Sequence, residues 1–319
     1  MSERREVTGL LAGSQTRRAQ LTHVVLTVTD PANLAAFYVE HFAMRRLAAS
    51  RPGRELLAHE SLPAARQTSG SFDAAHTAVL ELVRSPCAEP HLATFTKRDG
   101  YWKIGVTVAD VDAYRARLIA AGLAVSTPQQ FEDIGYLCHL TDPDTYPIEL
   151  LDHRMRPPLD TTGTPSLGPT RPRLAHVTLR VRDAQRSLAF YREGLGMTLL
   201  SRQRVEKHRF TLFFLACTDE TPPEPDLASV NNREWLWQRP YTCLELQHFH
   251  GSDDGTDSYR MYHDADHGFR ALGFEVPDLR AAIAVDAEQT SIAHDSTLGV
   301  DTALISDPDG YRIRLEQRR

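Results

Sequence analysis

Histidine and glutamate recur at matching places in the two halves of this chain. His23 and His176 each open an apolar, strand-like stretch, and Glu81 and Glu245 each lie inside a Leu-Glu-Leu stretch. Imidazole and carboxylate groups bind divalent metals and move protons. A single histidine or glutamate on a strand usually faces the core or the solvent. Their recurrence at equivalent points in both copies favours a metal-binding or catalytic role.

The surrounding sequence shows that the chain is built from a duplication. The stretch HVVLTVTDPANLAAFYVEHFAM, which starts at His23, returns without a gap from His176 as HVTLRVRDAQRSLAFYREGLGM. Two later echoes follow in the same order: GVTVADV from Gly105 matches GFEVPDL from Gly273, and DPDTYPIE from Asp142 matches DPDGYRIR from Asp307. Each half therefore contains two related units, which makes four in the chain.

The pattern of each unit predicts one strand, one helix and three further strands. Alternating apolar residues from His23 precede an aspartate that can cap a helix, in which Leu34, Phe37 and Tyr38 recur at helical spacing. The second unit repeats this plan, with a strand over 104–108, a helix over 110–123 and strands that close on 148–151. We therefore predict an α+β fold of two tandem modules, each made of two βαβββ units.

Chain length and local composition indicate where the modules begin and end. A chain of 319 residues suits about two domains, each large enough to bury a core. Residues 155–172 are rich in Pro, Gly and Thr, lack helical or alternating periodicity and lie between the two copies. We therefore expect a polar lead-in over 1–20, a first module over 21–154, a linker over 155–172 and a second module over 173–319.

Charge, cysteine usage and the lack of targeting signals favour a cytoplasmic protein whose partners are neither nucleic acid nor membrane. A formal net charge of −6 gives no reason to expect nucleic acid or an anionic membrane as a partner. The four cysteines are dispersed without CxxC spacing, which favours buried thiols over disulfides. The sequence shows neither a secretory signal nor an apolar run that could span a bilayer. We expect a cytoplasmic monomer or homodimer.

At module scale, the sequence resembles the vicinal oxygen chelate superfamily, which includes glyoxalase I and the extradiol dioxygenases. Residues 174–317 resemble glyoxalase I most, through HVTLRV, SLAFY, LGMTL, LEL, GFEVPD and DPDGY, and residues 22–152 resemble the superfamily more generically. The resemblance implies paired βαβββ units whose mixed sheets curl into open cups. It also implies a divalent metal on the inner face of each cup.

The resemblance further implies one metal-ligand position on each of four strands. The first units match this pattern with the two histidines and two glutamates that recur. In the second units, Lys103 and Ala271 stand where histidine is usual, Glu149 is kept, and Arg314 replaces the last glutamate. Ala271 has no donor atom, and the guanidinium of Arg314 has a permanent charge and no lone pair. We therefore expect one divalent metal per chain, which could be Fe, Mn, Ni or Zn.

The partners of Glu149 depend on how the four units pair. Consecutive pairing gives the ligand set His23, Glu81 and Glu149, whereas swapped pairing across the modules gives His176, Glu245 and Glu149. Either set supplies one imidazole and two carboxylates, with positions open for a substrate. The consecutive set is favoured slightly, because the same module also carries His139.

Several further side chains are candidates for catalysis or substrate binding beside Glu149. His139 could replace the missing histidine ligand or act as a general acid or base, or it could be a surface histidine. Lys103 could hold an anionic substrate group or pair with a glutamate, or it could simply reach solvent. Arg180 matches the arginine that glyoxalase I uses for a glutathione carboxylate, and Arg314 could also receive an anion. Phe249 replaces an asparagine of glyoxalase I, so efficient glyoxalase I activity is not expected.

Two functions of different classes remain open from the sequence. The first is a metal-dependent lyase or isomerase that moves a proton on a small, oxygen-bearing, anionic molecule, or an Fe(II) oxygenase that uses the same open metal face. The second is a metal-free protein that binds or sequesters a small molecule in degenerate cups. The complete His/Glu/Glu set that remains in either pairing favours the enzyme.

Overall fold

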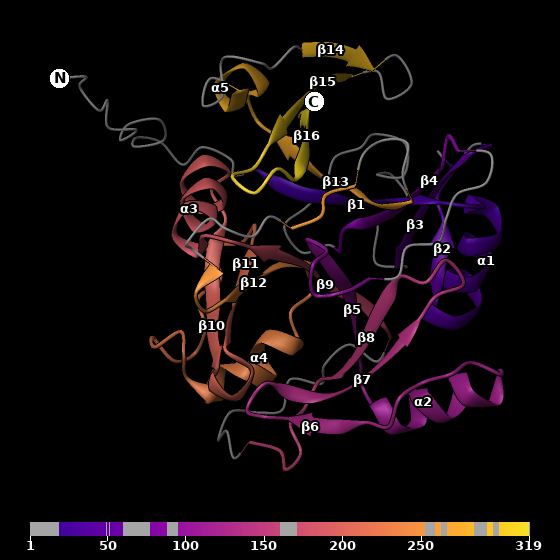
Figure 1. The fold of residues 1–319 in the computed structure, drawn as a ribbon, viewed down its shortest axis with the longest axis vertical. Helices are drawn as coiled ribbons and strands as arrows, with labels where there is room; N and C mark the ends of the chain where they lie inside the picture. Colours follow the sequence, from indigo (N-terminus) through magenta and orange to yellow (C-terminus); the bar gives the residue numbers. More distant parts are fainter. Residues whose placement is uncertain are drawn as a thin grey trace.

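Two eight-stranded mixed sheets make up the described part of the chain, as the computed structural model in Figure 1 shows. The structure describes residues 19–48, 50, 52–59, 77–87, 95–159, 171–252, 259–262, 267–283, 292–295 and 300–318. Residues 1–18 of the expected lead-in and 160–170 of the expected linker lie outside this set. No helix among the described residues is long and apolar enough to cross a membrane.

Each sheet combines a unit of the first module with a unit of the second. Sheet 1 has the strand order β14 (Ile292–Asp295), β15 (Val300–Ser306), β16 (Arg312–Gln317), β13 (Gly268–Val276), β1 (Gln20–Val28), β4 (Val79–Arg84), β3 (Arg54–His59) and β2 (Met44–Arg46). Sheet 2 has the order β10 (Thr198–Val205), β11 (Phe210–Ala216), β12 (Cys243–Phe249), β9 (Arg173–Val181), β5 (Tyr101–Val108), β8 (Pro147–Asp152), β7 (Gly135–Thr141) and β6 (Gln129–Phe131).

The units are joined across the middle of each sheet by antiparallel strand pairs. In sheet 1, β1 pairs with β13 and places His23 opposite Gly273. In sheet 2, β5 pairs with β9 and places Gly105 opposite His176. The first unit therefore meets the fourth and the second meets the third, which is the swapped pairing. The predicted α+β fold of two tandem modules with βαβββ units is confirmed.

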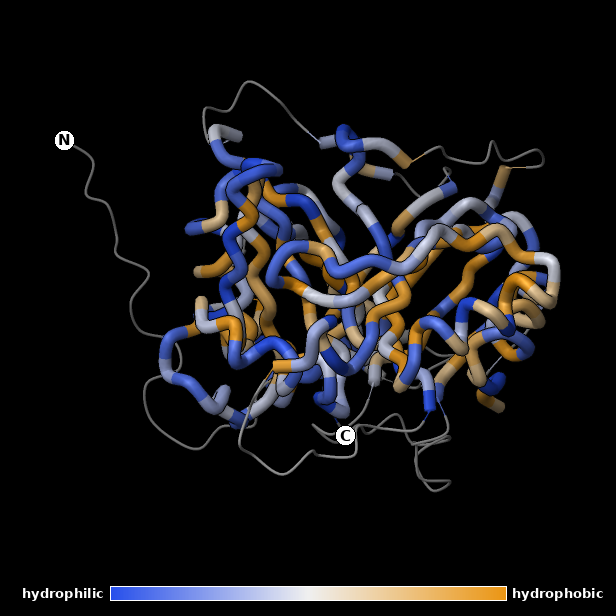
Figure 2. Tube along the Cα trace, turned by 90° about the horizontal axis from the view of Figure 1, so that it is seen from below, coloured by the Kyte–Doolittle hydropathy of each residue, from blue (hydrophilic) through white to orange (hydrophobic). Residues whose placement is uncertain are grey.

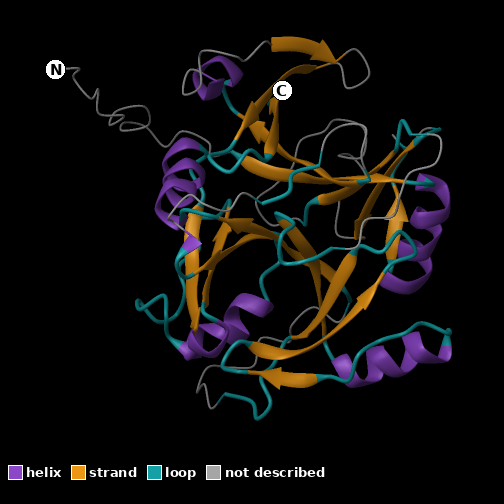
Figure 3. Ribbon diagram, in the orientation of Figure 1, coloured by secondary structure: helices purple, strands orange, loops and turns teal. Residues whose placement is uncertain are grey.

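The helix of each of the first three units begins after an aspartate, as the sequence predicts. Asp30, Asp110 and Asp183 accept backbone N–H groups at the starts of α1 (Pro31–Phe42), α2 (Val111–Ala120) and α3 (Ala184–Ala189). In the third unit, α3 continues into a π-helical turn over Phe190–Gly194. The fourth unit carries a short helix, α5 (Leu279–Ile283), and a further short helix, α4 (Arg233–Trp237), precedes β12 (Figure 3).

One large hydrophobic core joins the two sheets and their helices, and Figure 2 shows apolar segments running through the interior strands. The duplicated Asp-Pro-Asp turns form hydrogen bonds with the helices that pack on this core. Tyr38 of α1 donates a hydrogen bond to Asp142 at 2.8 Å, and Tyr191 donates one to Asp307 at 2.8 Å. Each bond joins the helix of one unit to the turn of the next, so it holds the two units of a module together.

A second, smaller core fills the inside of sheet 2. The sheet curls around α4, which lies between the strands of the second and third units (Figures 1 and 3). Apolar side chains from both units pack with α4 here, including Leu137, Leu151, Phe214, Leu236 and Trp237. The inner face of this sheet is therefore apolar and largely closed, and polar side chains on it require specific partners.

Candidate active site

Four strands of sheet 2 bring the polar candidates of the second and third units together. His176 lies on β9, Lys103 on β5, Glu245 on β12 and Glu149 on β8, and all four are at least nine-tenths buried. The strands pair directly, with Glu245 opposite Thr178, which lies two residues from His176, and Glu149 opposite Gly105. The duplicated strand pattern thus places an imidazole, an ammonium and two carboxylates at one point.

His176 lies between the two carboxylates. Its Nε2 atom is 3.3 Å from Glu149 Oε1 and 3.3 Å from Glu245 Oε2, yet neither ring nitrogen makes a hydrogen bond of good geometry with any residue that the structure describes. Gly105 makes room for the ring, because a Cβ atom at that position would lie 1.9 Å from His176 Cε1. Thr178 also donates a hydrogen bond to Glu245. The imidazole is therefore fixed by packing rather than by hydrogen bonds.

Lys103 supplies the positive charge of this cluster. Its Nζ atom is 2.7 Å from Glu149 Oε2 and 3.5 Å from Glu245 Oε2, and it lies 4.4 Å from the centre of the Trp102 ring. Burial alone would lower the pKa of Lys103, but the two carboxylates, Glu149 first, raise it above its usual value. The side chain is therefore an ammonium ion at neutral pH, held between two carboxylates.

Glu149 is the central residue of the cluster, and His139 connects it to the surface. Burial would raise the pKa of Glu149, but Lys103, His139 and His176 hold it well below its usual value. Glu149 is therefore ionised and a weak proton acceptor. His139 Nε2 lies 3.1 Å from Glu149 Oε2, and its side chain is 43% exposed. A carboxylate that orients a solvent-accessible imidazole is an arrangement suited to general acid–base catalysis.

The donor set and the position of Lys103 together decide whether a divalent metal fits. The orphaned imidazole of His176 and the two carboxylates are ligands of the right kind. Lys103, however, already contacts the carboxylate oxygens that a metal would need. In the described part of the chain, no three His, Cys, Asp or Glu side chains form a ready metal-binding group. The expected divalent metal does not fit while Lys103 holds this position.

The equivalent cup of sheet 1 is filled by arginine. Glu81 accepts hydrogen bonds from Arg54 Nε at 2.7 Å and from Arg314 Nη2 at 2.8 Å. Arg314 also pairs with Glu316 at 2.9 Å. Burial opposes ionisation of Glu81, but Arg314, His23 and Arg54 hold its pKa well below the usual range. Burial lowers the pKa of His23, so this histidine is neutral at pH 7. The cup is a closed ion-pair network.

The consecutive ligand set is therefore corrected by the fold. His23 and Glu81 lie in sheet 1 beside Arg314, whereas Glu149 lies in sheet 2, so these three candidates do not meet. The swapped set of His176, Glu245 and Glu149 does come together. The physical reason is that β1 pairs with β13 and β5 with β9, so each sheet takes its units from different modules.

Arg180 and Arg314, the two arginines expected to bind substrate, are both engaged by other side chains. Arg180 is buried and donates from Nε to Gln247 at 2.9 Å and from Nη1 to the carbonyl oxygens of Thr96 and Asp99 at 2.8 and 2.7 Å. It thus holds the 96–99 loop to sheet 2. Arg314 lies in the other cup, bonded to Glu81. Arg54 was missed by the sequence analysis, because nothing in its strand marks it as a partner of Glu81.

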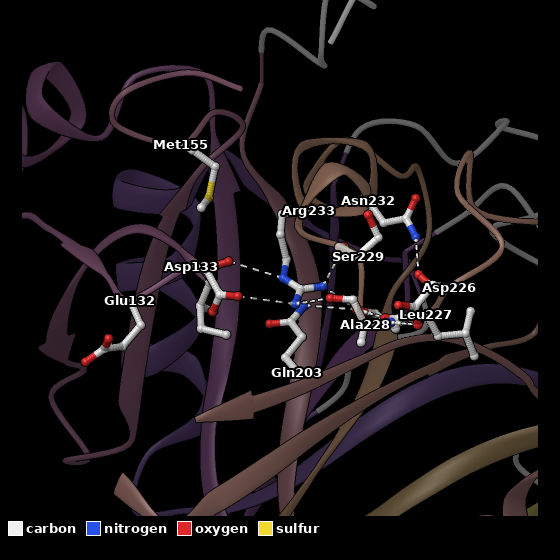
Figure 4. Close-up of polar contacts among 12 residues, drawn as sticks. Glu132, Asp133, Met155, Gln203, Asp226, Leu227, Ala228, Ser229, Asn232 and Arg233 are labelled. Atoms are coloured by element: carbon white, nitrogen blue, oxygen red, sulfur yellow. Dashed lines mark hydrogen bonds and ion pairs between the residues drawn. The ribbon is translucent and has the colours of Figure 1, made fainter. Parts of the chain in front are cut away.

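Arg233 anchors the short helix that closes the inside of sheet 2. This side chain is 1% exposed, and Figure 4 shows it between residues 132–133 of the second unit and the 226–229 segment of the third. It donates to the carbonyl oxygens of Asp133, Ser229 and Ala228, each at 3.2 Å, and to Ser201 Oγ at 3.0 Å. Trp237 at the end of α4 lies 6.4 Å from His176 between ring centres. The anchor thus fixes the apolar wall of the site.

Comparison with known proteins shows that the chain is similar to glyoxalase enzymes. A lactoylglutathione lyase of Pseudomonas aeruginosa is 37% identical over 155 residues, which cover 44% of this chain and 80% of that protein. Glyoxalase I of Saccharomyces cerevisiae is 27% identical over 323 residues, which cover 92% of this chain and 91% of that protein. The crystal structure of glyoxalase I from Zea mays shares the fold, with a TM-score of 0.64, 20% identity, and coverage of 94% of this chain and 92% of that one.

A family model places both modules in one superfamily. The model described as Glyoxalase/Bleomycin resistance protein/Dioxygenase superfamily matches residues 20–150 and 173–315, which are the parts that form the two sheets. The match spans most of the chain and includes all four residues of the cluster around His176. The chain therefore belongs to the Glyoxalase/Bleomycin resistance protein/Dioxygenase superfamily.

Proposed function

We propose that this chain is a glyoxalase-type lyase or isomerase with one active site, which lies in sheet 2 and moves a proton on a small, oxygen-bearing, anionic molecule. The observation that carries the proposal is the exposed imidazole of His139 held 3.1 Å from the buried carboxylate of Glu149. The names of the relatives from Pseudomonas and Saccharomyces support the class of reaction.

The residues divide into three roles under this proposal. His139 takes a proton from a C–H bond next to a substrate oxygen and returns it to the neighbouring carbon or oxygen. Its Nδ1 atom makes no hydrogen bond within the described residues, and Glu149 holds Nε2 and stabilises the imidazolium that forms. Lys103 provides the positive charge toward which negative charge develops on the substrate. Trp237 and the apolar wall restrict the entry of water.

The contacts of Arg180 support a substrate other than the glutathione hemithioacetal. The atoms Nε and Nη1 are taken up by Gln247 and by the 96–99 loop, so the residue that would receive a glutathione carboxylate is already engaged. Phe249, where an asparagine would be expected, packs against Phe210. Turnover of the hemithioacetal of methylglyoxal should therefore be weak.

Proton exchange in heavy water tests the proposal across a range of small acids. A panel of α-hydroxy and α-keto acids, together with the glutathione hemithioacetal, is incubated with the protein, and loss of the C–H signal is followed by NMR. We expect exchange with at least one small acid, and a loss of about 10²–10⁴-fold in His139→Gln. Glu245→Gln should also lose activity, whereas Glu81→Gln, its equivalent in sheet 1, should keep it. Equal activity in His139→Gln would refute the assignment.

A metal-free binding protein is the second candidate, and the closed ion-pair network of sheet 1 supports it. There Arg54 and Arg314 form ion pairs with Glu81, so this carboxylate is not available as a base. If both cups only bind, calorimetry should detect a ligand from the same panel while no member of it exchanges a proton. Exchange that depends on His139 would reject this candidate.

A further inference from the structure

We infer that the ammonium of Lys103 takes the place of the divalent metal in this site, so that the chain keeps the carboxylates and imidazole of a metal centre but works with a cation of its own. Only the activity part of this inference rests on the proposed function. The part that concerns metal binding rests on the geometry of sheet 2 and can be tested separately.

The contacts of Lys103 match those that a bound cation would make. Its nitrogen lies 2.7 Å from Glu149 and 3.5 Å from Glu245, the two carboxylates that also flank His176. Two buried carboxylates without a cation would carry a large desolvation cost. One ammonium neutralises half of their charge, and the hydrogen bonds from Thr178 and His139 help to stabilise the rest.

The duplication provides an independent second case. In sheet 1 the glutamate equivalent to Glu245 is Glu81, and it too is bound by protein cations, at 2.7 Å from Arg54 and 2.8 Å from Arg314. The strand equivalent to that of Lys103 carries Ala271, which lies opposite Val25. The two cups therefore reach the same result through different residues. Each replaces a metal with a basic side chain, and only sheet 2 retains a complete set of donors around it.

A metal and the ammonium cannot share these oxygens. A first-row metal bound to Glu149 Oε2 at about 2.0–2.2 Å would lie within about 5 Å of the Lys103 nitrogen, which is itself 2.7 Å from that oxygen. Two cations at that separation inside an apolar cup repel one another strongly. Lys103 is 3% exposed, so its ammonium could not move aside into solvent without a rearrangement of the strands around it.

Metal content is the direct test. The native protein, purified without a chelating tag and dialysed against Zn(II), Ni(II), Mn(II) or Fe(II), should retain only traces by mass spectrometry. Lys103→His replaces the ammonium by a neutral donor beside His176, Glu149 and Glu245, and it should retain about one equivalent of metal per chain. Lys103→Gln offers a second neutral donor if the histidine variant does not fold.

The matched control is Ala271→His, the same change in sheet 1. This variant should gain no metal, because Arg54 and Arg314 remain on Glu81. Stoichiometric metal in the native protein would overturn the inference. Folded Lys103→His and Lys103→Gln variants that both fail to gain metal would also overturn it, because the ammonium would then not be what excludes the metal.

The proton-exchange assay, run with and without EDTA, separates this inference from the proposed function. If the native protein exchanges substrate protons at the same rate with and without EDTA, both proposals are supported. Loss of exchange in EDTA would overturn the metal-free site while leaving the proton-transfer function intact. A protein that exchanges no proton but gains metal only on removal of Lys103 would refute the function and still support the replacement of the metal.

Discussion

At the scale of single residues, the site depends on a balance of charge rather than on any one catalytic group. Glu149 and Glu245 are nearly inaccessible to solvent, and carboxylates buried in this way are stable only with close partners. Among the described residues, Lys103 is the only lysine or arginine that forms an ion pair with either carboxylate. Removing it should therefore affect folding as well as chemistry.

A double-mutant cycle measures this balance. With a chelator present, Lys103→Met should lower the free energy of unfolding by about 3–5 kcal/mol, because it leaves two buried carboxylates without a cation. Adding Glu149→Gln should recover part of that loss, with a coupling free energy of about 0.5–3 kcal/mol. Urea denaturation measures both quantities.

The control is Lys207→Met, at a side chain that is 76% exposed, and its free energy of unfolding should stay within about 0.5 kcal/mol of that of the native protein. Purely additive effects would contradict the cycle.

The sequence could predict which residue types lie on the strands but not all of their partners. The duplicated pattern identifies His176, Glu245 and Glu149, but not the way in which the glycine that recurs at 105 and 273 accommodates a side chain. In the structure, the ring of His176 lies against Gly105. The link between Arg54 and Glu81 could not be predicted, because an arginine at the start of a strand is normally exposed.

At the scale of elements, the pairing of central strands decides which candidates meet. The sequences of β1 and β9 are near copies, and so are parts of β5 and β13, so each could in principle pair with either partner. Only the contacts across each sheet distinguish the two arrangements, and these join residues far apart in the chain, such as His23 with Gly273 in sheet 1 and Gly105 with His176 in sheet 2. This is why the sequence left the pairing open and why the preference for His23 was wrong.

The short helix α4 provides a prediction at this scale. Arg233→Met should release the 226–240 segment, because four hydrogen bonds from its guanidinium are lost and three partly buried carbonyl oxygens lose their donor. We expect faster amide exchange in that segment and a loss of about 2–3 kcal/mol in its opening free energy, whereas β9 should stay protected. Hydrogen exchange with mass spectrometry resolves the segments. Arg204→Met, with a side chain that is 64% exposed, should leave the exchange of both segments unchanged.

At the scale of the whole molecule, neither sheet can form from one module alone. Both are held together by pairs of strands from different halves, β1 with β13 and β5 with β9. A protease site placed between residues 160 and 170 should therefore give two fragments that elute together in size-exclusion chromatography under native conditions and separate only in denaturant. Fragments that separate without denaturant would contradict the swapped arrangement.

Buried ionisable groups give the whole molecule opposing responses to pH. Burial raises the pKa of Asp142 and of Asp307 to about 7, against an ordinary value of 3.8. Such a group stabilises the fold below about pH 4, and this contribution is lost as the pH rises through 7. Burial lowers the pKa of His59 and of His153 to about 4, so these residues make the fold more stable as the pH rises from 4 to 6.5. The total curve can therefore look flat.

Difference curves separate these opposing terms. The free energy of unfolding of the native protein minus that of Asp142→Asn should fall between pH 4 and pH 7, by an amount on the order of 4 kcal/mol for three pKa units. Asparagine can still accept the backbone N–H of Tyr146 and meet the hydroxyl of Tyr38, so the variant should fold. The corresponding difference for His59→Gln should rise between pH 4 and about pH 6.5, because burial shifts the pKa of this histidine in the opposite direction. Urea titrations at half-unit steps of pH measure both curves. Two curves with the same slope would show that burial does not hold Asp142 protonated, and that the link between this residue and Tyr38 carries a charge at neutral pH.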